Sequence, residues 1–156
     1  MNTEAPIDIS LSFTNDEYAA SAWYVCPVKI EPVINKSFIG NVAKGGSVNF
    51  NNITFNPHGN GTHTECVGHI TAEFYSVNKI LKQYWHKALL ISVVPEKLVK
   101  NTEYGRVDDL IILKTDIEKK IKKTNAQAII IRTLPNGSDK KSKQYSNSNP
   151  CYLQPE

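Results

Sequence analysis

The residues Ala88-Leu89-Leu90-Ile91-Ser92-Val93-Val94 decide the fold class of this chain. They form a nearly continuous apolar run that ends at Pro95, a pattern typical of a buried strand. A second run, from Ala126 to Arg132, contains three consecutive isoleucines and predicts another strand. We therefore expect two buried strands in the C-terminal half of the chain.

A short surface helix is predicted between these two strands. Ile117 and Ile121 fall on one face, lysines occupy the rest, and Thr115-Asp116 suits the start of a helix. The order strand, helix, strand favours a βαβ unit with a right-handed crossover and a parallel strand pair. Residues 110–113 are either a further strand or the lead-in to this helix.

The N-terminal half is predicted to be rich in β structure. Residues 7–13 alternate apolar and polar side chains, which indicates a half-buried strand. Residues 23–55 form short β segments separated by prolines and glycines, with Asn51-Asn52 as a turn or bulge. The fold class that we expect is α/β, a mixed sheet with a second β layer from the N-terminal half and helices on one side.

Three further segments complete the predicted organisation. Residues 77–84 place apolar side chains at helical spacing, with Ser76 as the N-cap. Residues 135–150 are almost wholly polar and predict an exposed loop. Residues 152–156 resemble the start of a helix. We therefore expect residues 1–156 to be a single domain, the N-terminal part of a longer one.

Composition limits the possible functions. The chain has 156 residues, 40% of them hydrophobic and 21% charged, with a net charge of +3, as expected for one globular domain. Its longest apolar runs are far below the ~20 residues that a membrane span needs. The first 20 residues show no basic, apolar leader, so a cytoplasmic location and no membrane partner are expected. The lysines of residues 119–123 and 140–143 lack interleaved aromatics, and we expect no nucleic-acid partner.

One short segment concentrates groups that can bind a metal ion. Three of the chain's four histidines lie within residues 58–69, together with Glu65, Gly59 and Gly61. Imidazole and carboxylate groups bind Zn²⁺ or Mn²⁺ at neutral pH, and the glycines allow the segment to bend. His63 and Glu65 are two residues apart, so in an extended segment both side chains project to the same face. The alternative is a set of surface histidines beside a glycine-rich turn.

The histidine segment also resembles a known signature. The pattern His58 … Gly61-Thr62-His63-Thr64-Glu65 … His69 is similar to the H-x-G-T-H-x-D-x-P-x-H motif of the cyclase-like metal-dependent hydrolase family, which includes bacterial kynurenine formamidases. Residues 7–10, Ile-Asp-Ile-Ser, resemble the I-D-L-S opening of that family, and residues 128–133 resemble a later strand that ends in R-T.

The resemblance implies specific roles for the motif residues. It implies that His58, His63 and Glu65 bind Zn²⁺, or alternatively Mn²⁺, and that His69 donates and accepts protons. The chain has two residues after His58 where the motif has one, so Asn60 is an alternative to His58 at the metal. Glu65 stands where the family usually has Asp, and it is one methylene longer.

The resemblance also implies a fold and a reaction. It implies a swivelling β/β/α architecture and metal-assisted hydrolysis of an amide, a formamide or a cyclic ester in a small-molecule substrate. Trp23 would stack on an aromatic substrate, its alternative being a packed core position, and a homo-oligomer is expected. The alternative function is a non-catalytic relic or an incomplete fragment, because the family's second metal site needs a further His and Glu from its C-terminal portion.

Overall fold

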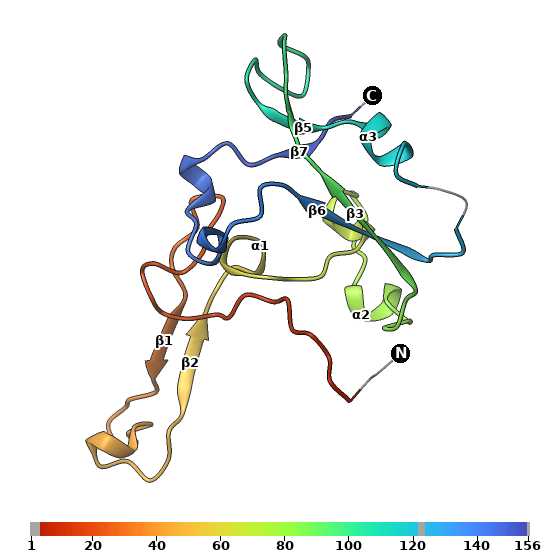
Figure 1. The fold of residues 1–156 in the computed structure, drawn as a ribbon. Helices are drawn as coiled ribbons and strands as arrows, with labels where there is room; N and C mark the ends of the chain where they lie inside the picture. The colour runs from red at the N-terminus through yellow and green to blue at the C-terminus, as the bar shows by residue number, and fades with distance from the viewer. Residues whose placement is uncertain (1–3, 122–123, 156) are drawn as a thin grey trace. The chain divides into compact units, whose positions relative to one another are not determined.

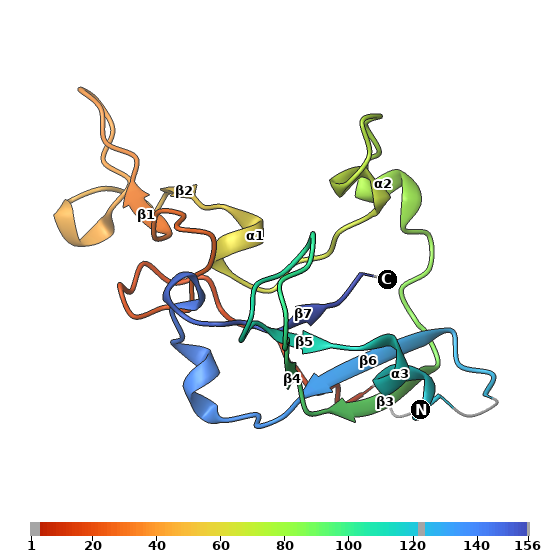
Figure 2. The same cartoon turned by 90° about the horizontal axis from the view of Figure 1, so that it is seen from above.

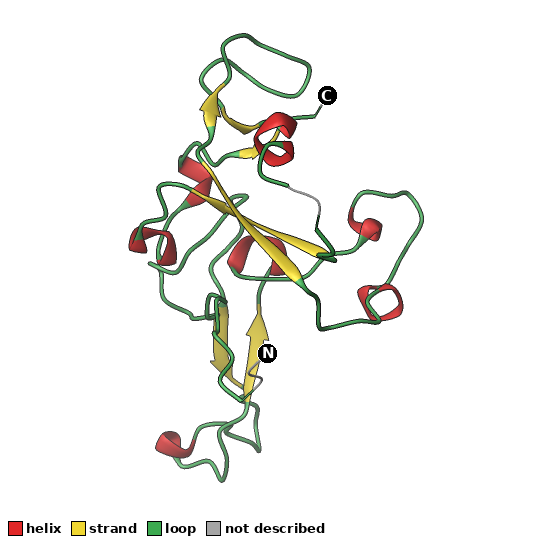
Figure 3. Cartoon of the chain, turned by 45° about the vertical axis from the view of Figure 1, so that its right-hand side comes forward, coloured by secondary structure: helices red, strands yellow, loops and turns green. Residues whose placement is uncertain are grey.

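The computed structural model describes residues 4–121 and 124–155, and contacts divide the chain into two compact units. Unit 1 comprises Met1–His63 and Asp139–Asn147, and unit 2 comprises Thr64–Ser138 and Ser148–Glu156. Loops join short helices and short strands in both units (Figure 3). Lysines 122 and 123 of the first predicted lysine cluster lie outside the described residues.

Unit 1 contains an antiparallel hairpin. It is formed by β1, Lys29–Pro32, and β2, Asn51–Thr54 (Figure 1). Ile30 lies opposite Ile53 in the register of this pair. A 3-10 turn at Val42–Lys44 lies in the connection, where Asn41 caps its start and Gly45 ends it in the left-handed region at φ 87°.

The rest of unit 1 joins segments that are far apart in the sequence. Residues 139–147 pair with the chain near Ser21, whose carbonyl accepts a hydrogen bond from the Tyr145 N–H at 2.8 Å. The Ser21 N–H donates to the Lys143 carbonyl at 3.2 Å. The short helix α1, Pro57–Asn60, contacts the same region, because the Gly59 carbonyl accepts a hydrogen bond from the Ala22 N–H at 2.9 Å.

Unit 2 is built on a parallel strand pair. Strands β3, Ala88–Val93, and β6, Ala128–Thr133, lie side by side in Figure 1 and in Figure 2. Their register runs from Ala88 opposite Ala128 to Val93 opposite Thr133. Across this pair, the Arg132 guanidinium donates to the Ser92 hydroxyl at 3.0 Å from Nε and 2.7 Å from Nη2.

A second sheet in unit 2 has the strand order β4-β5-β7. Strand β5, Leu110–Ile112, pairs antiparallel with β4, Glu96–Lys97, and parallel with β7, Tyr152–Leu153. The Tyr152 hydroxyl donates to the Asp109 carboxylate at 3.2 Å. Loss of hydration and this hydrogen bond both raise the pKa of Tyr152 above its ordinary value.

The helices of unit 2 are one or two turns long. They are the 3-10 turn Val67–His69, α2 at Val77–Ile80 and α3 at Lys114–Glu118. Helix α3 follows β5 directly, and Asp116 accepts a hydrogen bond from the Leu113 N–H at 3.0 Å, which stabilises the first turn. Within residues 4–121 and 124–155, no helix has the length and apolar content needed to cross a membrane.

The hydrophobic core of unit 2 is small. Ile91, Val93 and Ile112 are buried, and Val93 is only 2% exposed. Partly buried apolar side chains pack against them from β3, α3, β6 and the segment before β7: Leu89, Ile117, Ile131 and Cys151. This core joins one face of the β3–β6 pair to the second sheet.

The structure confirms the strand predictions for the C-terminal half. The apolar run at residues 88–94 forms β3, residues 126–132 contain most of β6, and the two strands pair in parallel as expected. Both expectations for residues 110–113 are met. Leu110–Ile112 form strand β5, and Leu113 is the N-cap residue of helix α3. The mixed α/β class is confirmed, and the single-domain expectation stays a prediction.

Two strand predictions for the N-terminal half are wrong. Residues 7–13 alternate as a strand would, but they find no ladder partner, and Ile7 and Ile9 are 89% and 80% exposed. The alternation predicted a buried face that this segment does not have. Asn51 and Asn52 form neither a turn nor a bulge, because both lie inside β2, opposite Pro32 and Glu31.

Two helix predictions also differ from the structure. Residues 152–153 form β7 rather than the start of a helix, since β5 offers them a strand edge, while Glu156 lies outside the described residues. The helix predicted over residues 77–84 ends at Ile80. Ser76 occupies the N-cap position but makes no capping hydrogen bond, so little stabilises a longer helix there.

The core of unit 2 predicts an asymmetry between neighbouring residues of β3. Ile91→Ala should lower the free energy of unfolding by about 3 kcal/mol, because Ile91 is 4% exposed and its truncation leaves a cavity. Leu90 is 54% exposed, so Leu90→Ala should lower the free energy of unfolding by less than about 1 kcal/mol. Urea denaturation of both variants measures the difference, and equal losses would contradict the placement of the core.

Candidate functional site

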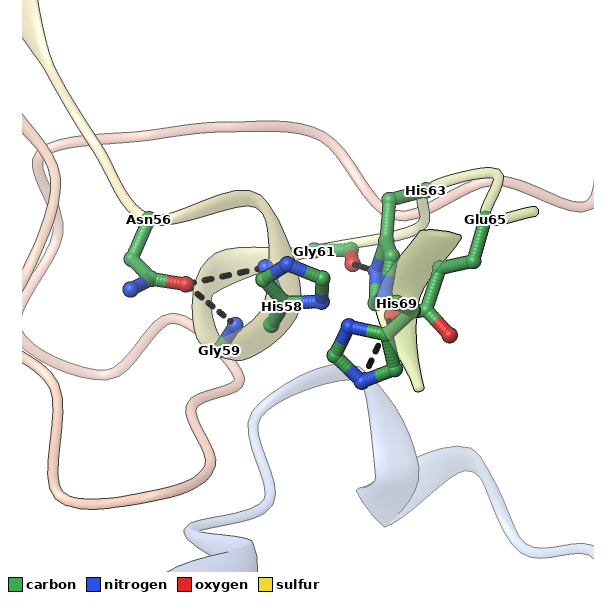
Figure 4. A network of polar contacts seen from close by, with 7 residues as sticks. All are labelled: Asn56, His58, Gly59, Gly61, His63, Glu65 and His69. Atoms are coloured by element: carbon green, nitrogen blue, oxygen red, sulfur yellow. Dashed lines mark hydrogen bonds and ion pairs between the residues drawn. The ribbon is translucent and has the colours of Figure 1, made fainter. Parts of the chain in front are cut away.

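The histidine segment begins at a one-turn helix whose start is capped by Asn56. The Asn56 side-chain oxygen accepts hydrogen bonds from the N–H groups of His58 at 2.9 Å and Gly59 at 3.2 Å (Figure 4). Pro57 occupies the first helical position, where a missing N–H costs nothing. This Asn-Pro start places His58 on a defined turn of the backbone.

The structure places His58 and Asn60 in different surroundings. Asn60 is buried, 5% exposed, and its side-chain N–H donates to the Cys26 carbonyl at 3.1 Å. Its side-chain oxygen accepts from the Asn56 N–H at 2.7 Å. Because both ends of this amide bind backbone groups, Asn60 acts as a support of helix α1, and His58 is the better candidate ligand.

His58 and His63 come together within unit 1. Their ring centroids are 5.0 Å apart, with an angle of 78° between the ring planes. His63 Nδ1 lies 2.9 Å from the Gly61 carbonyl oxygen. Because a carbonyl can only accept, Nδ1 carries the proton in this contact, and Nε2 then carries the lone pair that a metal ion would use.

Glu65 and His69 lie close together at the start of unit 2. The His69 Nε2 atom is 3.6 Å from a Glu65 carboxylate oxygen, with the two side chains 50% and 37% exposed. His69 ends the 3-10 turn that begins at Val67, and this turn brings its ring back toward Glu65. The motif's acidic residue and its last histidine therefore lie within reach of each other (Figure 4).

The three predicted ligands lie close enough together to be candidates for binding one metal ion. The candidate ligand atoms of His58, His63 and Glu65 all lie within 4.8 Å of one another, and all three residues are exposed. The boundary between the units falls after His63, and Glu65 follows two residues later. Chain connectivity thus keeps Glu65 near His63 whatever the placement of the two units.

The donor set fits a transition-metal ion. Two imidazole nitrogens and one carboxylate oxygen are ligands that Zn²⁺ and Mn²⁺ accept, and three protein ligands leave a position open for water or substrate. The hydrogen bond from His63 to the Gly61 carbonyl orients its ring, as outer contacts do in metal sites. The segment can therefore hold a metal ion.

A cavity lies beside His58 in unit 1. It has a volume of about 150 Å³, and its lining is mainly apolar. Its walls come from the segment before β1, from α1 and from the segment that returns to unit 1: Leu11, Ala20, Ser21, Ala22, His58, Gly59, Gly61 and Tyr145. This cavity could receive a small apolar group next to a metal at His58.

Trp23 comes directly after the lining residue Ala22 in the sequence, but its own side chain does not line the cavity. It is 78% exposed and has φ 58°, in the left-handed region that is unusual for a large side chain. The next residue, Tyr24, also has a positive φ and is tied to Ser146 by two hydrogen bonds, of 2.8 and 2.7 Å. Trp23 is therefore not a packed core residue, and its role in substrate binding stays a prediction.

Sequence reasoning missed several residues that shape the site. The capping role of Asn56 had a signal, the Asn-Pro pair directly before His58. Tyr145 had only a weak one, as an aromatic residue in a polar loop. Ser21 and Leu11 had none, because their places depend on contacts with distant segments, such as the hydrogen bond from Leu11 N–H to the Thr62 hydroxyl at 2.9 Å.

The fold and the site together define a class of protein, a mixed α/β protein with a His-His-Glu group suited to metal binding. A family model described as "Cyclase: Putative cyclase" matches residues 7–156. The chain therefore belongs to the cyclase family, as the histidine motif predicted. Searches of curated proteins and of solved structures found no match.

The cap of helix α1 predicts a matched pair of variants. Asn56→Ala should lower the free energy of unfolding by about 1 kcal/mol, because two N–H groups lose their acceptor. Asn56→Asp keeps a side-chain oxygen at the cap and should stay within about 0.5 kcal/mol of the parent. Urea denaturation of both variants measures the difference, and an Asn56→Ala variant as stable as the parent would contradict the capping role.

Proposed function

We propose that this chain is a metal-dependent hydrolase that cleaves an amide, a formamide or a cyclic ester of a small molecule. The observation that supports this most directly is the convergence of His58, His63 and Glu65 on a segment that carries the family motif. Membership of the cyclase family favours an enzyme. The reaction class is what the resemblance to the cyclase-like hydrolases implies, and the chemistry of this donor set is compatible with it.

The ligands in this proposal are His58, His63 and Glu65, and the ion is Zn²⁺, with Mn²⁺ as the alternative. When bound, such an ion lowers the pKa of a coordinated water towards ~7 and polarises a carbonyl group. The chain's own contribution is to orient the donors. Asn56 positions the turn that carries His58, and the Gly61 carbonyl fixes the ring of His63.

His69 is proposed as the residue that transfers the proton. An imidazole nitrogen can accept a proton from water and give it to a leaving amine. Its contact with Glu65 at 3.6 Å holds the ring beside the ligand group. In formamide hydrolysis, water adds to the carbonyl carbon, the C–N bond breaks, and the amine leaves with this proton.

The cavity beside His58 supports a small substrate with an apolar group. A cavity of ~150 Å³ lined by apolar side chains can hold a benzene ring. The cavity next to His58 has about this volume, so an N-formyl arylamine is a suitable probe. Trp23 is proposed as an aromatic contact for such a substrate, a role for which its 78% exposed side chain is accessible.

The finer architecture is part of the same proposal. We infer a swivelling β/β/α arrangement from the family resemblance, and the antiparallel hairpin of unit 1 and the parallel pair of unit 2 are consistent with it.

Metal content tests the ligand assignment. The parent chain, loaded with Zn²⁺ and dialysed, should retain about one ion per chain, and His63→Ala or Glu65→Ala should lower this at least tenfold because each removes a donor. His86→Ala is the control, since His86 lies outside the segment and contacts the Gln83 carbonyl. Plasma mass spectrometry gives the stoichiometry, and full retention in the first two variants would refute the assignment.

Activity separates the enzyme from its alternative, a relic that binds metal without turnover. The Zn²⁺-loaded chain should release aniline from formanilide, and His69→Ala should keep its metal but lose at least ~100-fold in rate, because proton transfer is lost. Chromatography of the released aniline measures this. A loaded parent chain with no turnover on formanilide or lactone probes would favour the relic, and an unimpaired His69→Ala would remove the proposed role of His69.

A further inference from the structure

The chain contains the dipeptide Asn-Gly twice, in two different structural settings. The first is Asn60-Gly61 at the end of helix α1, and the second is Asn136-Gly137, which follows strand β6. Asparagine is one of the thermolabile residues of proteins. Because glycine has no Cβ, the backbone nitrogen after each asparagine is open to approach and the backbone can turn freely. By sequence alone, both pairs are equally able to react with the asparagine side chain.

The reaction open to an Asn-Gly pair releases ammonia. The glycine nitrogen gives up its proton and forms a bond to the side-chain carbonyl carbon of the asparagine, while the bond from that carbon to Nδ2 breaks and ammonia leaves. The product is a succinimide ring. Water then adds to either ring carbonyl, and the ring C–N bond breaks to leave an aspartate or an isoaspartate. The net change consumes water and releases ammonia, and it needs neither an oxidant nor a reductant.

The fold protects Asn60 from this reaction. Its side chain is held at both ends, because Nδ2 donates to the Cys26 carbonyl at 3.1 Å and Oδ1 accepts from the Asn56 N–H at 2.7 Å. Its own N–H donates to the Asn56 carbonyl at 2.9 Å, and the residue is only 5% exposed. The side-chain carbonyl carbon of Asn60 can turn toward the Gly61 nitrogen only after these hydrogen bonds break.

Asn136 lies in a setting that permits the reaction. Asn136 and Gly137 are both exposed, and neither belongs to a helix or a strand. Strand β6 ends at Thr133, and the next element, the 3-10 turn Ser138–Lys141, begins after Gly137. No helical turn or strand ladder therefore fixes the backbone angles of this pair. Its exposure also gives water access to the ring for the second step.

We propose that Asn136 is a site of spontaneous deamidation, where the Gly137 nitrogen closes a succinimide ring and water opens it, while the fold protects the chemically equivalent pair at Asn60. The change replaces a neutral amide with a carboxylate and lowers the formal net charge of +3 by one unit. An isoaspartate at this position also adds a carbon atom to the main chain directly before the turn Ser138–Lys141. The reaction does not depend on metal binding or on the proposed hydrolysis.

Peptide mapping by mass spectrometry of the full folded chain tests this proposal. The chain is incubated at mildly alkaline pH in water enriched in heavy oxygen, which labels each carboxylate formed during the incubation. Deamidation at Asn136 should be at least tenfold faster than at Asn60, because Asn60 must first break its hydrogen bonds. In guanidinium chloride the two rates should agree within about threefold, since the fold no longer separates the two pairs. Equal rates in the folded chain, or a faster reaction at another asparagine, would overturn the proposal.

Two variants and a matched control provide a second test, read by ion-exchange chromatography of the more acidic species that accumulates. Gly137→Ala should slow its formation at least tenfold, because a Cβ crowds the attacking nitrogen. Asn136→Gln should slow it similarly, because the longer side chain must close a larger ring. The control Asn147→Gln alters an exposed asparagine that precedes a serine, and it should stay within about twofold of the parent. Unchanged accumulation in the first two variants, or an equal loss in the control, would refute the assignment to Asn136.

Discussion

Parallel pairing of β3 with β6 is the constraint on which unit 2 depends. Parallel strands cannot be joined by a tight turn, so residues 94–127 must leave the end of β3 and return to the start of β6. On this path the chain forms β4, β5 and α3, and β5 supplies Ile112 to the same small core as Ile91 and Val93. The strand pair and its connection thus stabilise each other.

The candidate site follows a different rule, because its geometry is local. Asn56 caps the turn that carries His58, the Gly61 carbonyl holds His63, and Glu65 follows two residues later. Each of these relations spans at most three residues. Such relations between near neighbours follow from the covalent chain, which limits how far residues two or three positions apart can separate.

This contrast explains which features the sequence could predict. The strands at residues 88–94 and 126–132 could be predicted because they are long apolar runs. The proximity of His63 and Glu65 could be predicted because they are two residues apart in the sequence. The strand expected at 7–13 failed because alternation creates no ladder partner, and β7 was missed because its partner β5 lies about forty residues earlier. The walls of the cavity beside His58 depend on Tyr145 and Leu11, whose positions no local pattern encodes.

The role of His69 decides what kind of metal site the segment can form. Structural zinc sites are closed by four protein ligands, whereas catalytic sites keep a position open for water. In the proposed site His58, His63 and Glu65 would supply three ligands, and His69, which lies 3.6 Å from Glu65, would be either a fourth ligand or a proton carrier. As a fourth ligand it would close the site and favour a structural ion. As a proton carrier it would leave one coordination position of the ion open for the water that hydrolysis requires. The exposure of all three ligands would give water access to that position.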